Sequence, residues 1–368
     1  MSLTGMPFFA LTIALAVVSV IALIALWNRI PGPAAARAAT RVTMTVFSQA
    51  AAVLMVLVYV NNSMGPFYDT WGDLFGSDAT VQLTGATNQI GSGGGSGRQG
   101  KGATAEKLSF TTYEPGVLKT VAVGPGSHIK GDMYVWLPPQ YNQPQYAHTD
   151  FPVVELLPGT PGTPQTWFGT MKVNEEMQKL MGEGKAKPMI LVAATLNMFG
   201  GGNDSGCVNL PGSYQTATWL AKDVPSLIKQ NFRAAPTAKN WAIMGYSAGG
   251  YCSANLTVQY PQSFHAGVMM SGYNAPNAGI VTKNPKLAAA NNPYLLLKHA
   301  KTQPDIVLLA AGSLADSDTV YAARSLVGAL KNPGNSKVMV LDRGGHTTAL
   351  FEKMMPDSLI WISQQIAT

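Results

Sequence analysis

The feature that most constrains this chain is a short glycine-rich sequence, Gly245-Tyr246-Ser247-Ala248-Gly249. It follows the apolar run NWAIM and precedes small residues that can begin a helix, so it joins a predicted strand to a predicted helix. So sharp a turn strains its central residue, and side chains two positions before or after it would collide with neighbouring backbone. The pattern therefore predicts that Ser247 projects its hydroxyl from the carboxyl end of a sheet, as a nucleophile.

A serine nucleophile needs a base, and the chain has five histidines: His128, His148, His265, His299 and His346. Where such a turn carries a catalytic serine, the acid and then the histidine follow it along the chain. We expect a capping or core role for His265, at the start of the next strand, and a surface position on a helix for His299. His346 follows the apolar run KVMVLD in the turn RGGHTT and is the predicted base.

The acid should come from the loop after the preceding strand, DIVLLAAG, where the sequence SLADSD offers Asp316 and Asp318. Asp318 precedes a predicted helix and would serve as its N-cap, so we favour Asp316 and keep Asp318 as the alternative. Asp342 is a third, less favoured candidate, because it precedes His346 closely in the sequence. The acid would hold the imidazole in one tautomer and stabilise the imidazolium.

Two backbone N–H groups are candidates for stabilising a developing oxyanion. The Ala248 N–H would open the helix after the turn. A second donor should follow an early strand, and VVELLPGTPGTPQTW fits this position. Since Pro158 and Pro161 have no N–H, the sequence favours Thr160.

The pattern of apolar runs predicts an α/β fold. Three segments rich in β-branched and aromatic residues begin at about residue 106, and six buried apolar runs then alternate with helical segments. One of these helices, TWLAKDVPSLIKQNF, is expected to continue through Pro225. Such alternation predicts a mostly parallel central sheet with helices on both faces and an antiparallel edge made by the leading strands.

The N-terminal part predicts two transmembrane helices, at about 7–27 and 42–60, because both runs are apolar and uncharged. Arg29, Arg37 and Arg41 lie between them, which places that loop in the cytoplasm. We therefore expect a multi-pass protein of the cell membrane whose catalytic domain is extracytoplasmic. The predicted domains are a membrane anchor (1–61), a Gly-rich linker (62–105) and a catalytic domain (106–368).

Charge and cysteine content argue against a nucleic-acid-binding protein and against a metal site built on a C-x-x-C pair. The formal charge of +6 is scattered, without the basic run that a nucleic-acid-binding protein would show. Cys207 and Cys252 do not form a C-x-x-C pair, so no metal site is predicted. Outside the cytoplasm the two cysteines are expected to form one disulfide.

Several segments together resemble the putative esterase family, which includes esterase D, feruloyl esterases and the antigen 85 mycolyltransferases. They are LLPG (156–159), DVPSLIKQNF (223–232), GYSAGG (245–250), YPQSF (260–264), MSG (270–272) and GGHTTALF (344–351). The resemblance implies an α/β-hydrolase fold that acts on acyl esters without a metal or organic cofactor. It places the nucleophile at Ser247, the base at His346 and the oxyanion donors at Thr160 and Ala248.

The expected function is hydrolysis of carboxylic esters, including lipid esters, through an acyl-serine intermediate. Two alternatives are an acyltransferase of the cell envelope similar to the antigen 85 enzymes, and a non-catalytic envelope protein on a hydrolase scaffold. An esterase and an acyltransferase share the acyl-enzyme and differ only in whether water or a bound alcohol attacks it. The sequence makes no prediction of oligomeric state, acyl chain or alcohol.

Overall fold

The computed structural model divides the chain into two units, Met1–Asp78 and Ala79–Thr368. It describes residues 5–63, 71, 82–83, 107–200 and 204–366. Most of the predicted linker 62–105 therefore lies outside the described residues, and the domain boundaries stay a prediction. Each unit is described below by itself.

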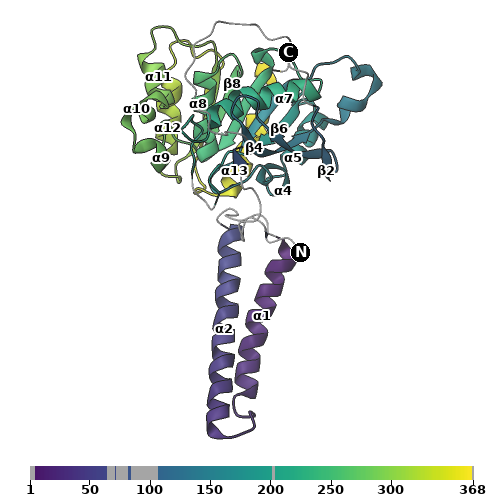
Figure 1. The fold of residues 1–368 in the computed structure, drawn as a ribbon, viewed down its shortest axis with the longest axis vertical. Helices are drawn as coiled ribbons and strands as arrows, with labels where there is room; N and C mark the ends of the chain where they lie inside the picture. The colour runs from purple at the N-terminus through teal and green to yellow at the C-terminus, as the bar shows by residue number, and fades with distance from the viewer. Residues whose placement is uncertain (1–4, 64–70, 72–81, 84–106, 201–203, 367–368) are drawn as a thin grey trace, which may run out of the picture. The chain divides into compact units, whose positions relative to one another are not determined.

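The first unit contains two long apolar helices, α1 (Met6–Leu26) and α2 (Ala34–Ser63), drawn in purple and blue in Figure 1. Small and polar side chains line their contact, where the Ser19 hydroxyl donates to the Ser48 hydroxyl at 3.3 Å. Both helices are long and apolar enough to cross a membrane, and most of each remains exposed.

The second helix begins earlier than the apolar run that predicted it. Arg37 and Arg41 were expected in the loop between the helices, but they lie in the first turns of α2. The segment AAARAATR is rich in alanine, the strongest helix former, so the helix extends past the apolar residues. The Arg41 side chain turns back to the end of α1 and donates to the Trp27 carbonyl at 3.0 Å.

In the second unit, the described strands form one sheet in the order β10-β9-β8-β7-β5-β6-β4-β3-β2, with β1 paired to β4. The bounds are β1 Gln82–Leu83, β2 Thr111–Glu114, β3 Val117–Val123, β4 Ile129–Trp136, β5 Val153–Leu157, β6 Ile190–Ala194, β7 Trp241–Tyr246, β8 Ala266–Met270, β9 Val307–Ser313 and β10 Lys337–Leu341. Strands β5 to β10 pair in parallel, and β4 joins β6 in antiparallel fashion. The predicted mostly parallel sheet with an antiparallel edge is confirmed.

Helices cover both faces of this sheet (Figure 1). One face carries α4 (Thr166–Gly169), α5 (Val173–Gly182) and α13 (Thr348–Ile366). The other carries α7 (Val224–Asn231), α8 (Ala248–Gln259) and α12 (Thr319–Gly328). The shorter helices are α6 Thr216–Thr218, α9 Gly279–Thr282, α10 Pro285–Ala290 and α11 Pro293–His299. Burial on two faces explains why β5 to β9 are continuous apolar runs rather than alternating ones.

One predicted helix is interrupted. The segment TWLAKDVPSLIKQNF forms the short α6, a π-helical turn over Trp219–Asp223 and then α7. Pro225 lies in the first turn of α7, where its missing N–H breaks no helical hydrogen bond. The wider π turn therefore allows the chain to pass the proline without losing the helical path.

Candidate active site

Ser247 occupies the turn between β7 and α8. Its backbone has φ 55° and ψ −123°, a conformation that residues with a side chain rarely adopt. The Ser247 N–H donates to the Met270 carbonyl of the neighbouring strand β8 at 2.9 Å, which fixes the turn to the sheet. The half-buried serine thus stands at the carboxyl edge of the sheet, where ligands of open α/β sheets bind.

The two flanking glycines are required by space. A Cβ at Gly245 would lie 2.1 Å from the Gly249 carbonyl oxygen. A Cβ at Gly249 would lie 2.3 Å from the carbonyl oxygens of both Leu157 and Pro158. The tightness of the turn therefore requires glycine at 245, and the close approach of α8 to the end of β5 requires it at 249.

The structure brings Ser247, His346 and Asp316 together. His346 Nε2 lies 2.8 Å from Ser247 Oγ, and His346 Nδ1 lies 3.0 Å and 3.1 Å from the two carboxylate oxygens of Asp316. The side chain of Asp316 is 4% exposed and that of His346 is 45% exposed. In this arrangement Nδ1–H donates to the buried carboxylate, which leaves Nε2 to accept the proton of the serine hydroxyl.

In the loop after β9, Asp316 and not Asp318 contacts His346, and the capping expected of Asp318 from the sequence does not form. Asp318 stands at the N-cap position of α12, but its side chain makes no capping hydrogen bond and is exposed. The Thr319 hydroxyl binds this loop instead, by donating to the Asp316 carbonyl at 2.8 Å. Asp316 turns inward toward His346, whereas Asp318 and Asp342 face solvent.

Three aromatic rings pack in a series that begins at the His346 imidazole. Phe351, in the first turn of α13, contacts His346 edge to face with ring centroids 5.2 Å apart. Phe351 stacks on Tyr246 at 4.8 Å, and Tyr246 contacts Trp167 at 5.3 Å. This column joins the base to the residue beside the nucleophile, which keeps the two loops at a fixed separation.

The loop after β5 lies against the serine turn. A Cβ built at Gly159 would approach the Ser247 Cβ to 3.2 Å, so the backbone preceding Thr160 passes directly beside the nucleophile. Among the described residues, the N–H groups of Thr160 and Ala248 donate no hydrogen bond to another protein group. Neither N–H group is therefore committed to a protein acceptor among these residues.

One residue beside this loop was assigned no individual role from the sequence. Asn197, three residues after β6, binds the loop through three hydrogen bonds that involve Gly159, Thr160 and Gly162. The only signal was a polar residue directly after a buried apolar run. Its hydrogen-bond partners could not be predicted from the sequence, because β6 and β5 are neighbours only in the folded sheet.

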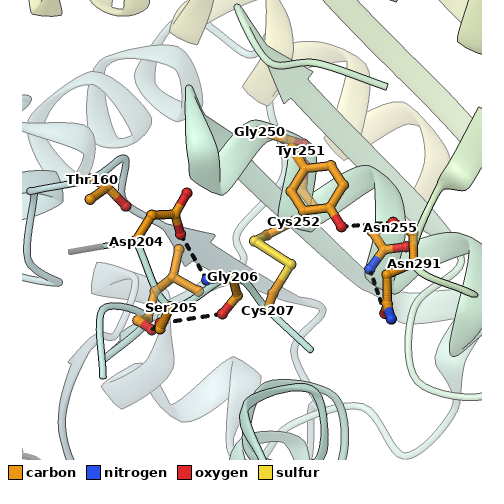
Figure 2. The surroundings of a disulfide bond; sticks show 12 residues. Thr160, Asp204, Ser205, Gly206, Cys207, Gly250, Tyr251, Cys252, Asn255 and Asn291 are labelled. Atoms are coloured by element: carbon orange, nitrogen blue, oxygen red, sulfur yellow. Dashed lines mark hydrogen bonds between the residues drawn. A yellow bond between two sulfur atoms is a disulfide. The ribbon is translucent and has the colours of Figure 1, made fainter. Parts of the chain in front are cut away.

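A disulfide joins Cys207 to Cys252, which are 45 residues apart (Figure 2). Cys252 lies in α8, five residues after the nucleophile, and Cys207 ends the segment 204–207 beside Thr160. The bridge therefore attaches this segment to the helix that begins directly after Ser247.

The other histidines take no part in the site. His265 is half-buried at the start of β8 and its Nδ1 contacts the Asp305 carbonyl at 3.3 Å, whereas His299 is exposed at the end of α11. Within the described ranges, no three His, Cys, Asp or Glu side chains are grouped so as to hold a metal ion.

Comparisons with known proteins agree with this geometry. The chain is 25% identical over 249 residues to an uncharacterized protein of Corynebacterium glutamicum; the match covers 64% of this chain and 57% of that protein. A ferulic acid esterase superposes with a TM-score of 0.58 at 20% identity over 67% of this chain and 97% of that one. An S-formylglutathione hydrolase from Agrobacterium tumefaciens gives 0.56 at 18% identity over 71% and 99%.

A fluorophosphonate-binding serine hydrolase from Staphylococcus aureus gives a TM-score of 0.52 at 14% identity, over 70% of this chain and 99% of that one. At these identities the structural likeness shows the α/β-hydrolase-like fold. The family model described as putative esterase matches residues 127–364, which contain all three residues of the Ser–His–Asp arrangement. This chain therefore belongs to the putative esterase family of serine hydrolases.

Proposed function

We propose that this protein is a membrane-anchored serine esterase that hydrolyses carboxylic esters outside the cytoplasm through an acyl-Ser247 intermediate. The observation that carries the proposal is the 2.8 Å contact between Ser247 Oγ and His346 Nε2, with His346 Nδ1 on the buried carboxylate of Asp316. A hydroxyl, a base and an orienting acid in hydrogen-bond contact form the set that nucleophilic acyl chemistry needs.

In the first half of the reaction Ser247 Oγ attacks the ester carbonyl carbon while His346 Nε2 takes the hydroxyl proton. The carbonyl oxygen becomes an oxyanion, which the N–H groups of Ala248 and Thr160 would stabilise. His346 then gives its proton to the leaving alcohol as the carbon–oxygen bond breaks, leaving the acyl group on Ser247. Asp316 remains ionised throughout and stabilises the imidazolium.

In the second half a water molecule takes the place of the alcohol. His346 removes a proton from the water, and the resulting hydroxide attacks the acyl carbon. The proton returns to Ser247 Oγ as the acyl bond breaks, which releases the carboxylic acid. Because His346 is partly exposed, water reaches the base directly.

The N-terminal helices and the disulfide support the proposed location. Two helices of membrane-spanning length with Arg29, Arg37 and Arg41 near their connection favour a cytoplasmic turn and an outward catalytic domain. The disulfide between Cys207 and Cys252 supports this location, because such bonds persist in oxidising compartments. The test is protease treatment of intact spheroplasts that carry a C-terminally tagged chain. Loss of the tag before lysis supports the topology, and protection until lysis contradicts it.

Carboxylic esters, including esters of lipids, are the proposed substrates. The similar solved structures include a ferulic acid esterase and an S-formylglutathione hydrolase, and these names support an acyl compound as substrate. Acyl transfer to a sugar gains no support from these similarities, so hydrolysis remains the proposal.

The proposal is tested with the detergent-solubilised full chain on a panel of esters. The panel combines nitrophenyl esters of rising chain length, a feruloyl ester and a lipid ester, with and without a sugar acceptor. We expect free acid from at least one ester and loss of several orders of magnitude in turnover for Ser247→Ala, with Ser226→Ala on α7 as the matched serine control. Equal turnover by wild type and Ser247→Ala would refute the proposal. Formation of acylated acceptor in place of free acid would show that the protein is an acyltransferase and not a hydrolase.

A further inference from the structure

Asn197 makes three hydrogen bonds to the loop that carries Thr160. Its Nδ2 donates to the Gly159 carbonyl at 3.0 Å and to the Gly162 carbonyl at 2.6 Å. Its Oδ1 accepts a hydrogen bond from the Thr160 hydroxyl at 2.7 Å. One side chain thus holds the two carbonyl groups that bracket Thr160 and the side chain of Thr160 itself.

The first of these bonds determines where the Thr160 N–H points. The Gly159 carbonyl and the Thr160 N–H belong to one planar peptide unit, and this unit is trans. In a trans peptide the C=O and the N–H point in opposite directions. By holding the Gly159 oxygen on its own side, Asn197 directs the Thr160 N–H to the opposite side of the loop. Rotation of this peptide would present a carbonyl oxygen where a donor is required.

Only a carboxamide of this length fits these contacts. The two carbonyl oxygens need two donors, and the Thr160 hydroxyl needs an acceptor. Asparagine supplies both kinds of group from one planar head. An aspartate has the same shape but no donor, so its oxygens would face the oxygens of Gly159 and Gly162.

Asn197 is itself held from outside the site. The buried Ser205 hydroxyl donates to the Leu196 carbonyl at 2.9 Å and accepts from the Met198 N–H at 3.1 Å, so it binds the backbone on both sides of Asn197. Ser205 lies two residues before Cys207, whose disulfide attaches this segment to α8 (Figure 2). A continuous path of bonds therefore leads from the helix of the nucleophile to Asn197.

We propose that Asn197 is the positioning residue of the oxyanion site: it fixes the orientation of the Gly159–Thr160 peptide, and Ser205 on the disulfide-anchored segment holds it in place. The proposal rests on the proposed esterase function and extends it to a residue that touches neither the substrate nor the catalytic serine. It predicts an effect on the charged tetrahedral state and little effect on binding of the neutral ester.

The test compares wild type with Asn197→Ala, Asn197→Asp and Ser205→Ala. Each is measured for kcat and KM on the best ester of the panel, and for inhibition by a trifluoromethyl ketone with the same acyl chain. In that adduct Ser247 Oγ bonds to the ketone carbon, the hydroxyl proton passes to His346, and the carbonyl oxygen becomes an oxyanion. Rates are normalised to the number of sites that react with a fluorophosphonate, so that unfolded protein does not count.

We expect Asn197→Ala to lower kcat about 10- to 100-fold, since complete removal of one oxyanion donor lowers it about 10²–10³-fold. The inhibition constant of the ketone should rise by the same factor while KM changes less than about twofold. Asn197→Asp should lose at least as much as Asn197→Ala, and Ser205→Ala should change kcat in the same direction by less.

Asn174→Ala is the matched control, because Asn174 is also a buried asparagine with a side-chain hydrogen bond, at 3.1 Å to Glu114, on the distant helix α5. It should lower the melting temperature and leave all three constants unchanged. The proposal is overturned if Asn197→Ala keeps wild-type affinity for the ketone, or if KM rises while kcat stays constant.

Failure of the esterase proposal would be distinct from this result. It would appear as absence of ester turnover by wild type. The inference would then be decided by the second-order rate of fluorophosphonate labelling, a reaction that also develops negative charge on an oxygen. Slower labelling of Asn197→Ala than of wild type supports the positioning role, and equal rates contradict it.

Discussion

His346 binds both carboxylate oxygens of Asp316 through a single nitrogen, at 3.0 Å and 3.1 Å. The two residues follow the neighbouring parallel strands β9 and β10, so their loops meet at one edge of the sheet although 30 residues separate them. Because the carboxylate is almost fully buried, its hydrogen bond to the imidazole is little screened by water.

Replacing Asp316 by asparagine tests this relationship. Asp316→Asn presents an amide to Nδ1 and favours the wrong tautomer of His346, so kcat should fall by about 10³–10⁴. Asp318→Asn, two residues away and exposed, is the matched control and should retain wild-type kcat. Steady-state kinetics on one ester measures both. The assignment of the acid is wrong if the two variants exchange these behaviours.

The glycine turn gives a second prediction. In Gly249→Ala the new methyl group would lie 2.3 Å from two carbonyl oxygens, which only a backbone shift can relieve. The protein should fail to fold or lose both stability and labelling of Ser247. Gly182→Ala, in α5 with no atom within 4 Å of the new Cβ, should raise the free energy of unfolding by about 0.4–1 kcal/mol. Denaturant melts of both variants decide this, and a Gly249→Ala protein of wild-type stability would count against the geometry of the turn.

How much of this site the sequence predicts depends on the range of the interaction. The turn at Ser247 is recognisable from a short pattern, and its Gly245 is required by a contact within the turn itself, with the Gly249 carbonyl. His346 and Asp316 could be placed because each lies in a loop after a recognisable strand. The reason given for preferring Asp316 was only partly right: Asp318 does stand at the N-cap position but makes no cap.

The contacts that could not be predicted from the sequence are those between elements that are distant along the chain. Asn197 reaches the Thr160 loop only because β6 lies beside β5, an order that apolar runs do not encode. The column from His346 through Phe351 and Tyr246 likewise depends on how α13 packs against β7. The early start of α2 had a visible signal in its alanines, but the charge of Arg37 and Arg41 suggested a loop.

The disulfide gives a third prediction. Closing a loop of 45 residues reduces the entropy of the unfolded chain, so Cys252→Ser should lower the free energy of unfolding by about 2–4 kcal/mol. Reduction of the wild type should shift its melting temperature to that of the variant. Peptide mass spectrometry of unreduced protein checks the bond itself, and finding both thiols free would contradict the prediction.

A buried acid in the sheet predicts how stability varies with pH. Glu155, in the middle of β5, is 0% exposed, and neither carboxyl oxygen has a hydrogen-bond partner among the described residues. Burial raises its pKa well above 4.5. In the unfolded chain the carboxyl ionises above that value, whereas the folded protein keeps the proton. Its contribution to stability is therefore greatest at low pH and falls as the pH rises toward the folded-state pKa.

Glu155→Leu should remove this pH dependence and raise the free energy of unfolding at neutral pH by about 1–3 kcal/mol, since a buried unpaired polar group is lost. Glu155→Gln should remove the pH dependence with a smaller gain, because its amide would still have no partner. Glu175→Gln, an exposed acid on α5, is the control and should stay within about 0.5 kcal/mol of wild type. Denaturant melts at pH 5 and pH 8 measure the effect; equal pH slopes for wild type and Glu155→Leu would contradict it.

The most direct test of the central claim is the site of covalent labelling by a fluorophosphonate, followed by peptide mass spectrometry of the full chain. Ser247 is predicted to carry the label, since its hydroxyl lies 2.8 Å from the base, and Ser247→Ala and His346→Ala are predicted to remain unlabelled. Labelling of another residue, or an equal yield of labelled protein from Ser247→Ala, would contradict the account.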